Sequence, residues 1–73
     1  MGLQLIVSAP DEDAVVSRLG KFASASEVFP LPTGAFGLSI PSKALDEKAE
    51  GEVRAQLAMF SVYDLYSGEW SKA

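Results

Sequence analysis

Alternation of apolar and polar side chains predicts a β-strand over residues 3–8. Three apolar side chains fall at every second position, and one more apolar residue lies between them. This period of two is typical of a strand that is buried mainly on one face. The buried face is expected to carry Leu3, Leu5 and Val7, with Ile6 on the opposite face.

A hairpin is predicted over residues 27–40. Prolines at positions 30 and 32 are incompatible with a helix interior, so residues 27–32 are expected to be extended. Thr33-Gly34 is typical of a turn, and residues 35–40 then resume the period of two. The inward-facing side chains of this second strand are expected to be Phe36, Leu38 and Ile40.

Helical spacing of apolar residues predicts two helices. The first covers residues 11–23, with Ser8 as a candidate cap, acids at its start, and the apolar residues Val15, Val16, Leu19 and Phe22. The second opens at Pro41-Ser42 and ends near Met59, with Asp46 and Glu47 in its early turns. Its apolar stripe is Leu45, Ala49, Val53, Leu57 and Phe60.

Residues 60–66 fit two interpretations. They are rich in strand formers, yet Phe60 and Tyr63 would also continue the second helix. We favour a strand, which gives the order β-α-β-β-α-β over a single domain of residues 1–73. The sequence thus predicts an α+β sandwich with ferredoxin-like order, in which two helices cover one face of an antiparallel sheet of three to four strands.

Composition narrows the possible chemistry. The 73 residues include no histidine and no cysteine, and ten acidic residues outnumber six basic ones, for a net charge of −4. Without thiols the chain has no disulfide, no cysteine nucleophile and no ordinary structural zinc site. No histidine is present to activate a serine, and no phosphate-binding glycine motif occurs. We therefore expect a protein that is not an enzyme and that uses no metal or other cofactor.

Charge and hydropathy also restrict the expected partners and location. A net charge of −4 disfavours direct nucleic-acid binding, which depends on clustered lysine and arginine. The apolar stretch near the start is too short to cross a membrane and lacks a basic leader. A protein partner with a basic surface and a cytoplasmic location are the expectations.

The candidate binding residues form two groups. On the second predicted helix, Glu50 precedes Arg54 by four positions, which favours an ion pair, and a solvated helix surface is the alternative explanation of these acids. Near the end of the chain, acids alternate with aromatic rings that either complete the core or form an interface. The candidates are Asp46, Glu47 and Glu50 on the helix, and Asp64, Tyr66, Glu69 and Trp70 in the acidic–aromatic segment.

About half of the chain resembles a small type I anti-CRISPR protein of bacteriophages. The resemblance lies in residues 35–42 (Ala-Phe-Gly-Leu-Ser-Ile-Pro-Ser), in Leu45 with Asp46-Glu47, and in Ala55-Gln56-Leu57. Gly68-Glu69-Trp70 and the early Ile6-Val7 with Pro10-Asp11 add to it.

The resemblance implies a stoichiometric inhibitor. Such a protein would present Asp46, Glu47 and Glu69 in place of DNA phosphates to a basic, DNA-binding surface of a host complex, in the bacterial cytoplasm. The alternative that we derive from the residues is a structural or assembly module. It would form a homo-oligomer, of which a homodimer is the simplest case, through Tyr63, Tyr66 and Trp70.

Overall fold

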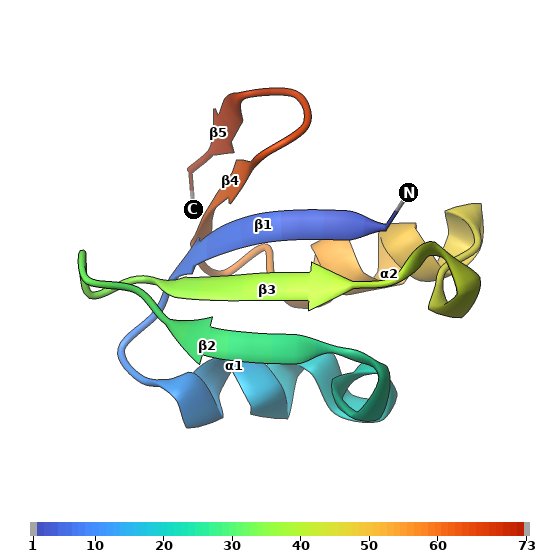
Figure 1. The fold of residues 1–73 in the computed structure, drawn as a ribbon, viewed down its shortest axis with the longest axis horizontal. Helices are drawn as coiled ribbons and strands as arrows, with labels where there is room; N and C mark the ends of the chain where they lie inside the picture. The colour runs from blue at the N-terminus through green and yellow to red at the C-terminus, as the bar shows by residue number, and fades with distance from the viewer. Residues whose placement is uncertain (1, 73) are drawn as a thin grey trace.

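A five-stranded antiparallel sheet forms the centre of this α+β protein. The computed structural model describes residues 2–72, and the strand order across the sheet is β2-β3-β1-β4-β5. The strands are β1 (Leu3–Ser8), β2 (Glu27–Pro30), β3 (Phe36–Ile40), β4 (Ser61–Asp64) and β5 (Glu69–Ser71). The first strand of the chain therefore lies in the middle of the sheet (Figure 1).

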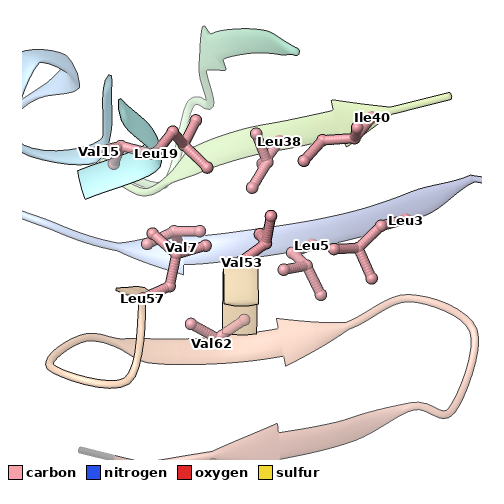
Figure 2. Packing of buried hydrophobic residues seen from close by; sticks show 10 residues of the cluster. All are labelled: Leu3, Leu5, Val7, Val15, Leu19, Leu38, Ile40, Val53, Leu57 and Val62. Atoms are coloured by element: carbon pink, nitrogen blue, oxygen red, sulfur yellow. The ribbon is translucent and has the colours of Figure 1, made fainter. Parts of the chain in front are cut away.

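The predicted alternation along β1 is confirmed. Leu3, Leu5 and Val7 are each at most 1% exposed, whereas Ile6 lies on the opposite face and is half-buried. Register carries this division across the sheet, since directly opposite residues share a face. Leu5 pairs with Leu38, Leu3 pairs with Ile40, and these side chains lie together in the core (Figure 2).

The first helix is shorter than predicted and has a different cap. Helix α1 spans Glu12–Leu19, and Asp11 caps it by accepting a hydrogen bond from the Ala14 amide at 2.8 Å. Ser8 was the wrong cap, because it is the last residue of β1. Gly20 ends the helix with a φ of 56°, a value that favours glycine, and a 3₁₀ segment, η1 (Gly20–Ala25), follows.

The second helix begins later and ends earlier than its apolar stripe suggested. Ser42–Ala44 forms a separate 3₁₀ turn, η2, and helix α2 spans Glu47–Gln56 with Asp46 as its cap. Asp46 accepts from the Ala49 amide at 2.7 Å, so it precedes the helix and does not lie in its early turns. The stripe itself is confirmed at its centre, since Val53 and Leu57 are at most 1% exposed.

The hairpin of β2 and β3 is confirmed. Its connection turns at Gly34, which has a φ of 91°, and the Leu31 amide donates to the Ala35 carbonyl at 2.9 Å. Of the expected inward side chains of β3, Leu38 and Ile40 are buried and Phe36 packs against the core while partly exposed.

Residues 61–64 form a strand, as we favoured, and do not continue the helix. The prediction of three to four strands is nevertheless wrong, because the terminal segment adds β5 as a fifth. The Ser67-Gly68 break allows this addition. Gly68 has a φ of 70° and its amide donates to the Asp64 carbonyl at 2.8 Å, which turns the chain back along β4. In Figure 1 this β4–β5 hairpin projects away from the remaining strands.

Both helices lie on one side of the sheet (Figure 1). Val15 and Leu19 of α1 and Val53 of α2 join the buried side chains of β1, β3 and β4 in a single cluster (Figure 2). The opposite side carries no helix within residues 2–72, and we call it the open face. The sheet has therefore one face for folding and one face that meets solvent.

Candidate functional site

The three candidate acids at the start of α2 all stabilise the helix. Asp46 is the N-cap, and Glu47 and Glu50 lie in the first turn, where carboxylates stabilise the positive end of the helix dipole. The expected pair is present, with Glu50 Oε2 at 3.6 Å from Arg54 Nε. Glu47 is exposed, and unlike Asp46 and Glu50 it is neither the helix cap nor the partner of Arg54.

Asp64 connects α2 to the β4–β5 hairpin. Its Oδ2 accepts a hydrogen bond from Arg54 Nη2 at 2.6 Å, while its Oδ1 accepts from the backbone amides of Tyr66 and Ser67 at 2.8 and 3.2 Å. The Asp64 side chain is 15% exposed and that of Arg54 is 41% exposed. Asp64 thus has a structural role, because both of its carboxylate oxygens accept hydrogen bonds from within the protein.

The contacts of this pair move both pKa values. The hydrogen bond from Arg54 is the main cause of a lowered pKa at Asp64, which burial opposes and the backbone amides of Tyr66 and Ser67 reinforce. The pKa of Arg54 is raised, chiefly by the same hydrogen bond. Both groups are therefore charged at neutral pH, and the ion pair is fully formed there.

The predicted acidic–aromatic segment is divided between the two faces of the sheet. Glu69 is the register partner of Asp64, so both acids leave the sheet on the helix side. Trp70 pairs with Tyr63 on the open face, with ring centroids 5.2 Å apart and planes at 54°. The seven candidates consequently do not form one contiguous patch.

The exposure of Tyr66 and Trp70 decides whether these two rings complete the core, which was one of the two alternatives for the acidic–aromatic segment. Tyr66, in the β4–β5 turn, is 51% exposed and Trp70 is 54% exposed, so neither completes the core. Large exposed rings of this kind are enriched where proteins contact each other. Of the candidate residues, Trp70 has the most exposed apolar surface beside a second ring.

A row of large side chains crosses the open face from one edge of the sheet to the other. Register places Phe29 beside Gly37, Gly37 beside Ile6, Ile6 beside Tyr63, and Tyr63 beside Trp70. Phe29 is 45% exposed, while Ile6 and Tyr63 are half-buried. We call Phe29, Ile6, Tyr63 and Trp70 the aromatic row, after its three aromatic members.

Gly37 gives the aromatic row its shape. A Cβ atom at this position would overlap the ring of Phe29, so the ring lies directly over the glycine backbone. Beside it the open face is hollowed by about 330 Å³, with Gln4, Ser39 and Leu65 among the lining residues. The face therefore combines projecting rings with a depression.

Sequence reasoning missed Phe29 and Leu65 as surface residues. The signal was present for Phe29, because residues 27–30 alternate and Val28 packs against the core, which directs its two neighbours outward. For Leu65 the sequence alone gives no such signal, because its position depends on the bond from its amide to the Gln4 carbonyl at 3.1 Å.

Charges are distributed unevenly between the two faces. The strands contain three charged residues, and two of them, Asp64 and Glu69, leave the sheet on the helix side. Only Glu27, on the edge strand β2, points to the open face from a strand. Depletion of charge together with enrichment of aromatic rings is typical of the centre of a protein–protein interface.

Within residues 2–72, no three histidine, cysteine or carboxylate side chains gather in a way that could hold a metal ion. No helix in this part of the chain is long and apolar enough to cross a membrane. Comparison of the chain with protein-family models, curated proteins and solved structures yields no match.

Proposed function

We propose that the protein is a non-enzymatic binding module whose binding surface is the open face. The observation that carries this proposal is the aromatic row, whose four members lie on β2, β1, β4 and β5, on a face with one charged strand residue. Aromatic side chains offer large contact areas at a small entropic cost, which favours binding over plain solvation.

The fold is part of the proposal. Along the chain, α1 connects β1 to β2 and α2 connects β3 to β4. Together with the strand order β2-β3-β1-β4, these connections support a ferredoxin-like arrangement, to which β5 is added at one edge. In such an arrangement two helices fold against one side of the sheet and leave the other side available. The small size of the chain makes that remaining side a large share of its surface.

A comparison of captured proteins tests the proposed function. Tagged wild-type protein and the Trp70→Ala variant are used to capture proteins from bacterial lysate, and every captured species is quantified by mass spectrometry. Met59→Ala is the matched control, because Met59 is also 54% exposed but lies outside the aromatic row. We expect at least one species to be lost with Trp70→Ala and retained with Met59→Ala. Equal capture by all three proteins would contradict a binding role for the open face.

A second candidate function is a stoichiometric inhibitor of a basic, DNA-binding protein surface. Glu47 favours it, because this exposed acid stands at the start of α2 beside the cap Asp46. Charge reversal of Asp46 would remove the cap, so the informative double variant is Asp46→Asn with Glu47→Lys, in which asparagine still caps.

Salt dependence separates the two candidates. Binding through carboxylates to a basic surface weakens steeply between 50 and 500 mM salt, on the order of tenfold or more, because exposed charges are screened. Binding through the aromatic row changes little over the same range. The inhibitor hypothesis fails if a partner is retained at high salt and by the Asp46→Asn, Glu47→Lys variant.

A further inference from the structure

The largest exposed rings of the aromatic row are placed symmetrically about the central strand. In the order β2-β3-β1-β4-β5, Phe29 lies two strands from β1 on one side and Trp70 lies two strands from it on the other. With strands about 4.8 Å apart, each residue lies roughly 10 Å from β1. A two-fold axis that runs close to the direction of β1 therefore brings Phe29 of one copy opposite Trp70 of a second copy.

The same axis places large side chains opposite small ones. Gly37 and Ser39 lie on β3, one strand from β1, and Tyr63 of β4 lies one strand away on the other side. Leu65, which is 48% exposed and hydrogen-bonded through its amide to Gln4, continues β4 in the same direction. In two facing copies, Tyr63 meets the Phe29 ring over Gly37, and Leu65 meets the hollow beside Ser39. The surface is thus complementary to itself.

Charge and size are compatible with a second copy. The net charge of the chain is −4, but the only charged strand residue on the open face is Glu27, at the edge of the sheet. Two facing copies therefore bring no strand carboxylates together near the axis. The molecule measures 29 and 24 Å along its two longest axes, and Figure 1 views it down the shortest. Those lengths limit a flat interface to roughly 700 Å² on each copy, a little below the roughly 800 Å² that each partner contributes to a standard interface.

From these observations we propose that the open face is the interface of a homodimer. The two sheets pack face to face about a two-fold axis close to β1, and Phe29 of each copy contacts Trp70 of the other. This inference rests on the proposed function, which makes the open face a binding surface, and it assigns the partner as a second copy of this chain. Each Phe29–Trp70 contact occurs twice, as in any two-fold interface.

Sedimentation equilibrium over 1–200 µM tests the dimer. We expect wild-type protein to dimerise in this range, and either Trp70→Ala or Phe29→Ala to raise the dimer dissociation constant by at least about 30-fold, the change typical of a residue at an interface centre. Met59→Ala is expected to leave the constant within about threefold. Because Phe29 and Trp70 contact each other across the axis, the double variant should lose less than the two single losses combined.

A charge at the axis gives an independent test that removes no ring. Gln4 is exposed on β1, so in the proposed dimer it faces Gln4 of the other copy. Gln4→Glu places two carboxylates face to face and should abolish the dimer while leaving the far-ultraviolet circular dichroism spectrum of the monomer unchanged. Retained dimerisation of a folded Gln4→Glu variant overturns the proposed axis.

The outcomes separate this inference from the proposed function. A wild-type protein that stays monomeric at 200 µM overturns the homodimer. If Trp70→Ala still loses a captured protein of different sequence, the open face remains a binding surface and only the identity of the partner changes. A dimer that is insensitive to Trp70→Ala, Phe29→Ala and Gln4→Glu alike overturns the interface proposed here.

Discussion

Removal of the Asp64 side chain tests how the β4–β5 hairpin is held to the rest of the protein. Asp64→Asn retains an Oδ1 acceptor for the amides of Tyr66 and Ser67 but loses the charge that pairs with Arg54. Asp64→Ala loses both kinds of contact. The two variants therefore divide the contribution of Asp64 into an ion pair and a turn.

The magnitudes follow from exposure. The guanidinium of Arg54 is 41% exposed, so water screens the pair and Asp64→Asn should cost about 0.5–1 kcal/mol. Asp64→Ala also gives up two charge-assisted bonds to turn amides, which raises the expected loss to about 2–3 kcal/mol. A chain of this length has a total stability of roughly 4–11 kcal/mol, so the alanine variant should unfold at a clearly lower urea concentration.

Urea denaturation provides the measurement, with the free energy of unfolding taken from circular dichroism. Fluorescence of Trp70 reports separately on the hairpin, since this residue is the only tryptophan and lies on β5. Glu50→Gln is the control, because it removes the 3.6 Å contact with Arg54 and one charge from the first turn of α2 but leaves every contact of Asp64 in place, and it should cost about 1 kcal/mol or less. Equal stability of the asparagine and alanine variants would refute the role assigned to the turn bonds.

The ion pair also predicts a dependence on pH. Because folding lowers the pKa of Asp64, its pairing contributes stability that is fully present above the unfolded pKa of about 3.9. That contribution is lost as the pH falls through the lower folded pKa. The stability difference between wild type and Asp64→Asn should therefore be constant from pH 5 to 8 and shrink below pH 4. A difference that persists at pH 2 would contradict the electrostatic origin.

Substitutions at three further positions probe the helix cap, the core and the open face. Asp46→Ala should lower stability by about 1 kcal/mol in thermal denaturation, whereas Asp46→Asn should stay within a few tenths, and equal losses would contradict capping. Leu38→Ala, which empties a core position that is 2% exposed, should cost about 2–5 kcal/mol in urea denaturation. Gly37→Ala should destabilise the wild type, because the added methyl group displaces the Phe29 ring. In a Phe29→Ala background the methyl group meets no ring, so the same substitution should be stabilising. If the stability changes of the two substitutions simply add in the double variant, the contact between Gly37 and the Phe29 ring is refuted.

Local sequence patterns predicted β1 and β3 well because one face of each is buried. The alternation of Leu3, Leu5 and Val7 and the turn at Gly34 depend only on neighbouring residues, and both predictions are confirmed. The ends of the helices were predicted less well. Apolar spacing continues beyond α1 into Phe22, yet Gly20 changes the helix type, and Asp11, not the predicted Ser8, caps α1.

The candidate site was harder to predict because it depends on register. Sequence adjacency grouped Asp64, Glu69 and Trp70, but alternation along β5 sends Glu69 and Trp70 to opposite faces. Phe29 and Trp70 are 41 positions apart, and only the strand order brings them onto one row. The pairing of Asp64 with Arg54 spans only ten positions, but it also depends on the fold, since it joins a helix to a strand.

The central position of β1 has a consequence for biosynthesis. Residues 3–8 are synthesised before their two hydrogen-bonding neighbours, β3 and β4, which end at residues 40 and 64. One edge of β1 therefore stays unpaired until β4 has been translated, and the core that Val62 completes cannot close before then. A nascent chain halted before Ser61 therefore exposes an apolar strand edge for chaperones to cover.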